Sequence, residues 1–147
     1  MSLYRHFPSK DDLIVAYLED SRRHFWEWLD NATADTEDAA EKLVAIFAAT
    51  EQLVARPDCL GCTFQSTAAE FPDPDHPAHR VAVAHKLAIR ARFADLALQA
   101  DLRDPEELAY QLQFLMEGAL VAARMFGSDN TGTGLTRAAA TLIDAHR

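Results

Sequence analysis

The segment from Pro105 to Phe126 constrains the fold more than any other part of the chain. Asp104 as N-cap, a proline at the first helical position and Glu107 at the third form a helix-start signal, and Gly127 ends the helix. After its first turn, this helix has a narrow polar stripe that consists of Gln113, Glu117 and Arg124, with Tyr110 at its margin. Almost every other position is apolar or glycine, and one subunit cannot cover so much apolar surface. The segment therefore predicts a helix that packs partly against a second copy of the chain.

The rest of the chain also carries helical patterns. Apolar residues recur at helical spacing in residues 9–31, 36–56, 77–102 and 135–143, and a shorter helix is expected from about residue 61 to 71. Asp35 or Thr36 is expected to cap the second of these helices. Segment 77–102 is apolar on two sides, one with Leu87 and Leu98 and the other with Ile89 and Phe93, which predicts an interior helix. Together these segments predict an all-α fold with a single core, for which 147 residues are ample.

Charge and composition limit the function. The chain has 14 Lys and Arg against 23 Asp and Glu, a net charge of -9, so this part of the protein is not expected to grip nucleic acid by itself. No apolar run is long enough to cross a bilayer, no secretory leader opens the chain, and two cysteines are too few for a disulfide scaffold. These features predict a cytoplasmic protein, and no cofactor is expected.

The opening residues predict the end of one helix and the start of the next. Pro8 lacks a backbone N–H and restricts the residue before it, so a preceding helix would stop there. Ser9 is a favourable N-cap, and Asp11 and Asp12 suit the positive end of a following helix. The sequence thus predicts a tight corner followed by a helix that continues to about Asn31.

This corner resembles the junction between the recognition helix and the next long helix in the TetR family of bacterial repressors. The matching residues are Leu3, Tyr4, His6, Phe7, Ser9, Lys10 and Leu13. The resemblance implies that Tyr4, His6 and Lys10 contact DNA phosphates, whereas the alternative is that the aromatic residues beside Pro8 simply pack together. A TetR protein has helices before this point. Residues 1–8 are therefore interpreted as the remnant of a helix-turn-helix domain, and residues 9–147 as an effector-binding and dimerisation domain.

A second stretch is similar to one branch of TetR regulatory domains, in which a short helix borders the ligand cavity. It combines Gly61-Cys62-x-Phe64 with the sequence Ala-Ala-Glu-Phe-Pro at residues 68–72. The resemblance implies a transcriptional repressor, not an enzyme, that binds a small effector and then releases operator DNA. Effector binding would shift the helix of residues 9–31 and change the distance between the two DNA-binding domains of a homodimer.

Polar or bulky residues at or beside the inward sides of the helices predict the effector cavity, because a close-packed core would favour plain aliphatic residues there. They indicate an aromatic or otherwise flat apolar ligand with a few polar groups. The predicted lining is His24, Trp28, Phe47, Thr50, Phe64, Thr67, His85, Ile89, Tyr110, Phe114 and Glu117. Core packing is the alternative for each residue singly, and a neighbouring carbonyl could satisfy His24.

The dimer interface is predicted on the last two helices, which in TetR proteins pair with their copies in a four-helix bundle. Small residues such as Gly118 and Ala119 would let the two backbones approach closely. The predicted interface is Leu108, Leu112, Leu115, Gly118, Ala119, Ala122, Phe126, Leu135, Ala138, Ala139 and Leu142.

Cys59 and Cys62 carry the main competing hypothesis, an all-helical thiol redox sensor or peroxidase-type protein. The alkylhydroperoxidase D group also uses a CxxC pair, but it places a histidine shortly after the second cysteine, where this chain has none. His76 and His79 have a spacing seen in metal ligands. The prolines around them favour a solvated surface loop instead, so no metal site is expected.

Overall fold

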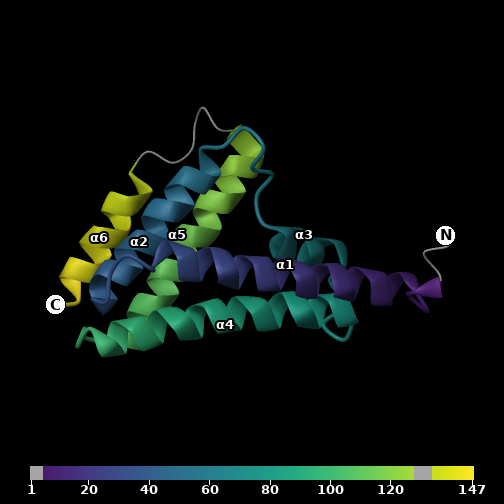
Figure 1. The fold of residues 1–147 in the computed structure, drawn as a ribbon, viewed down its shortest axis with the longest axis horizontal. Coiled ribbons are helices and arrows are strands. Elements are labelled where there is room, and N and C mark those ends of the chain that lie inside the picture. The colour runs from purple at the N-terminus through teal and green to yellow at the C-terminus, as the bar shows by residue number, and fades with distance from the viewer. Residues whose placement is uncertain (1–4, 128–133) are drawn as a thin grey trace. The chain divides into compact units, whose positions relative to one another are not determined.

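The computed structural model describes residues 5–127 and 134–147. These residues form helices and no strands, which confirms the all-α prediction (Figure 1). The helices are α1 (Lys10–Ala32), α2 (Ala39–Val54), α3 (Thr63–Glu70), α4 (Pro77–Gln99), α5 (Pro105–Phe126) and α6 (Leu135–Ala145). Across the two described ranges, every helix is too short or too polar to span a bilayer.

Local capping explains where α1 begins and where α5 ends. The Ser9 hydroxyl accepts the backbone N–H of Asp12 at 3.1 Å and donates to the Asp12 carboxylate at 2.6 Å, which confirms Ser9 as the N-cap. Gly127 has a φ of 73°, and its N–H donates to the carbonyl of Ala123 at 3.0 Å. The predicted glycine stop is therefore confirmed.

Two predicted helix starts are wrong in their details. The N-cap of α2 is Asp38, whose carboxylate accepts the N–H of Glu41 at 2.8 Å, and not Asp35 or Thr36. The Thr36 hydroxyl instead accepts the backbone N–H of Asp38 at 3.2 Å, and Asp38 is the residue just before the helix. Asp104 adopts a left-handed conformation with a φ of 49°, and its side chain makes no capping hydrogen bond. The start of α5 therefore depends on Pro105 at the first helical position and not on a capping box.

The chain divides into two compact units. Among the described residues, 5–28 and 63–88 form the first unit, and 29–62, 89–127 and 134–147 form the second, so α1 and α4 contribute residues to both. In the second unit α2, α5 and α6 pack side by side (Figure 1). Its core is made of large apolar side chains that are almost fully buried: Leu43, Ile46, Phe47, Phe93, Leu108, Leu112, Met116 and Ile143.

The packing of α5 corrects the predicted dimer interface. Leu108, Leu112 and Ala139 are fully buried inside the second unit, so they are not available to a partner subunit. Half-buried residues account for most of the remaining prediction: Leu115, Ala119, Ala122, Leu135, Ala138 and Leu142. Of the predicted interface residues, only Gly118 and Phe126 are exposed. Because α2 and α6 cover the side of α5 that carries Leu108 and Leu112, the helical period turns a different apolar row outward.

The exposed apolar row of α5 contains larger side chains than the predicted interface. Its members are Tyr110, Phe114, Val121, Met125 and Phe126, which are 42–69% exposed, and Gly118 lies among them. We call this surface the outer row of α5. It is unusual for one helix face to expose this many large apolar side chains.

The prediction that α4 is an interior helix is wrong for one of its two apolar sides. Ile89 and Phe93 are buried as expected. Leu87 and Leu98, on the other side, are 50% and 65% exposed. A helix that is apolar on two sides gives no local signal of which side turns toward the core.

Candidate functional site

An aromatic cluster encloses the imidazole of His85 in the first unit. His85 is 1% exposed, and its ring stacks on Phe64 with centroids 3.8 Å apart and an angle of 24° between the ring planes. The Phe25 ring meets the same imidazole edge-on, with centroids 4.8 Å apart, and the centroid of the Trp26 ring lies 6.3 Å from that of the imidazole. We call Phe25, Trp26, Phe64 and His85 the His85 cluster. It draws on three helices, α1, α3 and α4.

Helix geometry places each ring. Phe64 is the second residue of α3, so it stands where the chain enters that helix. Phe25 and Trp26 are neighbours on α1, and their rings meet edge-to-face at 5.4 Å. His85 is two helical turns into α4, on the same side as the buried Ala78 and Ala82. The cluster therefore forms where the inward sides of these helices converge.

The electrostatics of the cluster keep the imidazole uncharged. Burial, together with the positive charges of Lys86 and Arg22, lowers the pKa of His85 to about 4. The neutral ring at pH 7 has one nitrogen that donates and one that accepts. Its Nδ1 atom is buried and has no hydrogen-bond partner. A buried polar atom without a partner costs about 1–3 kcal/mol, so Nδ1 is a position where a ligand group would gain free energy by binding.

Four of the predicted pocket residues lie in or next to the cluster. Phe64 and His85 are members of it. Thr67 is buried one turn further along α3, and its hydroxyl donates to the carbonyl of Thr63 at 2.9 Å. Trp28 lies next to a member of the cluster, because its ring centroid is 5.5 Å from that of Phe25.

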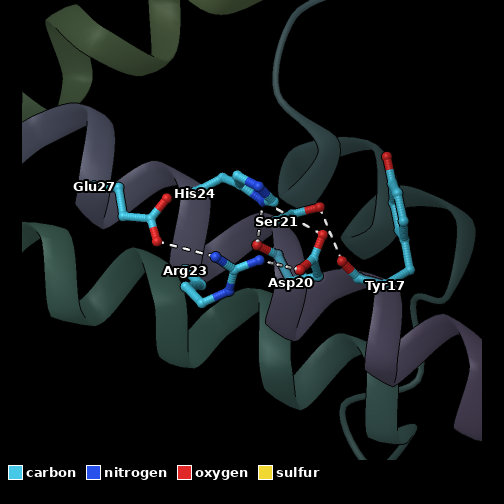
Figure 2. Close-up of polar contacts among 6 residues, drawn as sticks. All are labelled: Tyr17, Asp20, Ser21, Arg23, His24 and Glu27. Atoms are coloured by element: carbon cyan, nitrogen blue, oxygen red, sulfur yellow. Dashed lines mark hydrogen bonds and ion pairs between the residues drawn. The ribbon is translucent and has the colours of Figure 1, made fainter.

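His24 does not belong to the cluster, and its role in an effector pocket stays a prediction. It lies on an exposed polar row of α1, where its Nδ1 is 2.9 Å from the carbonyl oxygen of Asp20 and 3.3 Å from the Asp20 carboxylate (Figure 2). Arg23 continues this row with hydrogen bonds to Asp20 at 2.6 Å and Glu27 at 3.0 Å. A neighbouring carbonyl therefore satisfies His24, which was the alternative that the sequence left open.

The remaining predicted pocket residues belong to the second unit. Phe47, Thr50 and Ile89 are buried there, and the Thr50 hydroxyl donates to the carbonyl of Ile46 at 2.8 Å, so these residues serve the core. Tyr110 and Phe114 are 45% and 69% exposed on the outer row of α5, and their place in an effector cavity stays a prediction. Glu117 is half-buried on the same helix.

Sequence reasoning missed two members of the cluster. Neither Phe25 nor Trp26 is among the pocket residues predicted from the sequence, although both rings contact that of His85. The available signal was the pair of consecutive aromatic residues. One turn of α1 can present both rings to a neighbouring helix only when that helix crosses close by.

The structure gives His76 and His79 separate partners. His79 Nδ1 is 2.7 Å from the carbonyl oxygen of Phe71, and His76 makes separate contacts, so the two do not converge on a metal. Within residues 5–127 and 134–147, no three side chains of the metal-ligating types come together. Cys59 and Cys62 are not joined in a disulfide, and both are partly buried. His6 and Lys10 are exposed, and Tyr4 lies outside the described residues.

Comparison with known families decides what kind of protein carries this cluster. A family described as "Tetracyclin repressor-like, C-terminal domain" matches residues 39–139, which is more than half of the chain. The chain belongs to the TetR family of transcriptional regulators. The resemblance inferred from the opening corner and from the residues around Phe64 is thereby confirmed.

Relatives and solved structures agree with the TetR assignment. The HTH-type transcriptional regulators YjdC of Escherichia coli K12 and of Shigella flexneri are each 29% identical over 119 residues. Those residues are 80% of this chain, and the match spans 62% of the length of each relative.

Two solved TetR-type structures have the same fold. SCO4454, a TetR-family transcriptional regulator from Streptomyces coelicolor, has a TM-score of 0.91 and 29% identity over 98% of this chain and 76% of its own. The sav143 regulator from Streptomyces avermitilis MA-4680 has a TM-score of 0.85 and 31% identity over 98% of this chain and 78% of its own. These relatives are named as regulators and not as enzymes, so the thiol peroxidase alternative receives no support.

Proposed function

We propose that this chain is the regulatory part of a TetR-family repressor, in which a small effector binds at the His85 cluster and controls release of operator DNA. The family match supports the regulatory role. The buried, unpartnered Nδ1 of His85, enclosed by aromatic rings, is the observation that carries the choice of site. The protein is proposed to act without catalysis and, as a DNA regulator, in the cytoplasm.

The chemistry of the cluster defines the effector class. Three aromatic side chains offer flat apolar contact surface, and the neutral imidazole offers one hydrogen-bonding atom. A flat aromatic molecule with a hydroxyl or similar neutral group would satisfy Nδ1 and stack on the rings. An apolar molecule of the same shape would leave the buried nitrogen without a partner.

We propose that two copies of the chain pair through the outer row of α5. Tyr110, Phe114, Val121 and Met125 supply exposed apolar surface there. A Cβ atom placed on Gly118 would meet nothing within 4 Å in this chain, so the helix backbone is open to close approach at that point. The guanidinium of Arg90 lies 4.0 Å from the centre of the Tyr110 ring and holds that ring in place.

DNA binding is proposed for the regulator that includes a helix-turn-helix segment, with residues 1–8 as its end and residues 9–147 as the regulatory domain. Tyr4, His6 and Lys10 would contact phosphates, as the resemblance implies. The 147-residue chain alone, with a net charge of -9, is expected to bind no duplex specifically.

The effector site can be tested with two matched probes, 2-naphthol and naphthalene, by thermal-shift measurement and titration calorimetry. We expect 2-naphthol to bind at least about tenfold more tightly, because one hydrogen bond to a buried atom is worth roughly 1.4 kcal/mol. The His85→Phe variant should bind both probes equally. Tyr110→Ala, on the outer row of α5, is the control and should keep the preference. Equal binding of the two probes to the unaltered chain would refute the site.

A further inference from the structure

Two thiols lie in the connection between α2 and α3. Cys59 and Cys62 are the two cysteines of the chain, and they stand three positions apart without a disulfide between them. We call residues 59–62 the thiol loop. Helix α2 ends at Val54, α3 begins at Thr63, and the thiol loop between them forms neither helix nor turn. Its backbone path is therefore set by contacts with the rest of the second unit.

An ion pair stands just before the thiol loop. The Arg56 guanidinium donates to both oxygens of the Asp58 carboxylate, at 2.9 and 2.7 Å, and the backbone N–H of Cys59 donates to the Arg56 carbonyl at 3.1 Å. The hydrogen bonds to Asp58 are the main reason why the pKa of Arg56 is raised, and the charge of Cys59 adds to the effect. The Arg56 guanidinium therefore lies close enough to attract a thiolate at Cys59, and the thiolate is the form of a cysteine that reacts with oxidants.

Gly61 lies close against α5 within the second unit. It has a φ of 86°, and a Cβ atom placed on it would lie 3.0 Å from the carbonyl oxygen of Leu120 and 3.1 Å from Cβ of Arg124. The backbone of the thiol loop therefore approaches the backbone of α5 closely at this point. Leu60, the residue before Gly61, is 80% exposed and contributes little to the packing. The contact of Gly61 with α5 is thus the contact that a change in the path of the loop would break.

A disulfide requires a different path for the thiol loop. The Cα atoms of bridged cysteines lie about 4.4–6.8 Å apart. In a chain without a turn, residues three positions apart are separated by about 10 Å. Bridging Cys59 to Cys62 therefore requires a turn at Leu60 and Gly61. That turn moves Gly61 away from α5, and the Leu60 side chain loses little burial when it forms, because it is already exposed.

We propose that Cys59 and Cys62 form a redox modification site, at which a peroxide converts the two thiols to a disulfide and releases the thiol loop from α5. The thiolate of one cysteine attacks an oxygen of hydrogen peroxide and the O–O bond breaks. A sulfenic acid forms, and the leaving hydroxide takes up the proton that the thiol gave up and becomes water. The second thiol then attacks the sulfenic sulfur, the S–S bond forms and a second water leaves. Two thiols are thereby oxidised to one disulfide, and one peroxide is reduced to two waters.

The modification is distinct from both catalysis and effector binding. It consumes the thiol pair once and is not a peroxidase cycle. Cys59 and Cys62 are not members of the His85 cluster, so oxidation does not depend on an effector bound there. It gives the regulator a second input, which acts on α5 through the contact at Gly61.

The chemical step is tested on the 147-residue chain without denaturant, with hydrogen peroxide and with glutathione as a competing thiol. Mass spectrometry of an unreduced digest should find Cys59 linked to Cys62 within one chain, and dithiothreitol should reverse the link. We expect the pair to be oxidised at least about threefold faster than glutathione, because Arg56 attracts the thiolate. A link between two chains, separate sulfinic acids, or oxidation no faster than that of glutathione overturns the site.

Two matched arginine variants test the electrostatic part of the site. Arg56→Gln removes the charge beside Cys59 and should slow oxidation at least about twofold. Arg80→Gln is the control, since Arg80 forms a similar exposed ion pair with Asp75 at 2.7 Å, and it should leave the rate unchanged. Equal rates in the two variants overturn the role of Arg56.

Release of the thiol loop is tested with Gly61→Ala in the reduced and the oxidised chain, at concentrations too low for two copies to pair. In the reduced chain the new Cβ meets α5, so the variant should lower the folding equilibrium constant by about tenfold or more. In the oxidised chain that contact is absent, and the loss should be at least about threefold smaller. Gly118→Ala, whose Cβ meets nothing within 4 Å, should have the same effect in both states. Equal losses for Gly61→Ala in the two states overturn the release.

A measurement on the unaltered chain protects this test against a variant that does not fold. Protons of Gly61 and of the Arg124 side chain should give a nuclear Overhauser contact in the reduced chain, because the two residues lie side by side there. Oxidation should remove that contact. A contact that persists in the disulfide form overturns the release.

Discussion

Glu51 on α2 accepts a hydrogen bond at 3.1 Å from the backbone N–H of Thr136, a residue 85 positions later in the chain. The same carboxylate accepts the N–H of Gly134 at 2.7 Å and the hydroxyl of Thr136. The N-cap position of α6 is Gly134, which has no side chain to satisfy these groups. A carboxylate from another helix therefore caps α6.

Loss of this cap should destabilise the second unit. We expect Glu51→Gln to lower the free energy of unfolding by about 1–2 kcal/mol at pH 7, because the charged acceptor at the helix start is lost. Urea unfolding monitored by circular dichroism measures the effect. Glu37→Gln is the control, since the Glu37 side chain is fully exposed and forms only a 3.4 Å ion pair with Lys42. A loss below about 0.5 kcal/mol at Glu51 would show that the cap is unimportant.

The cap should also depend on pH in a defined direction. The hydrogen bond from Thr136 is the main reason why the pKa of Glu51 is below its usual value of 4.5. The unfolded state then binds the proton more readily, so the stability from Glu51 is complete above the unfolded pKa and is lost as pH falls through the folded pKa. The stability difference between the unaltered chain and Glu51→Gln should therefore shrink below about pH 4.5. A difference that grows on acidification would contradict this linkage.

Alanine at Gly61 and at Gly118 should have opposite effects. Gly61 has a φ of 86°, and a Cβ there would lie 3.0 Å from the carbonyl oxygen of Leu120 and 3.1 Å from Cβ of Arg124. We expect Gly61→Ala to cost about 1–3 kcal/mol. Gly118→Ala should stabilise the subunit by about 0.5–1 kcal/mol, since it lies in a helix and meets nothing within 4 Å. Thermal unfolding of the two variants in parallel, at concentrations too low for two copies to pair, measures both effects on the subunit.

The outer row of α5 should control the oligomeric state. Val121→Arg places a charge on this row without disturbing the core, because Val121 is already 42% exposed. If two copies pair there, the buried charge should weaken dimerisation by roughly 3 kcal/mol, or about 100-fold. Leu87→Arg on α4, where the leucine is 50% exposed, is the matched control and should leave the dimer intact. Sedimentation equilibrium distinguishes the two variants, and a monomeric unaltered chain at micromolar concentration would remove the basis for this interface.

Burial of His85 should make folding sensitive to mild acid. The pKa of His85 is lowered from 6.5 to about 4, so between these values the unfolded state binds the proton and the folded state does not. Stability should therefore fall as pH drops below 6.5, by about 2 kcal/mol at pH 5. His85→Phe should lose this part of the pH dependence. Imidazole titration by NMR gives the folded pKa directly, and a value near 6.5 would show that the ring is accessible to water.

Helix class and helix ends could be predicted from the sequence because their causes are local. Ser9 caps α1, Pro105 starts α5 and Gly127 ends it through hydrogen bonds and dihedral restrictions that involve residues at most four positions apart. The family could be predicted for the same reason, since the matching residues lie in two short stretches. Asp38 and Asp104 were the exceptions. Several polar residues compete for each cap, and small differences in backbone dihedral angles decide among them.

The site and the surface were decided by the tertiary structure, because they depend on which helix faces meet. On α5 both sides are apolar. The helix packs against α2 and α6 with Leu108 and Leu112 buried, and Phe114 and Val121 are left exposed. In the same way the pattern of α1 could not distinguish His24, which turns toward water, from Phe25, which turns toward His85. One residue along a helix is a rotation of about 100°, so a small error in the assumed orientation moves a side chain from solvent to the interior.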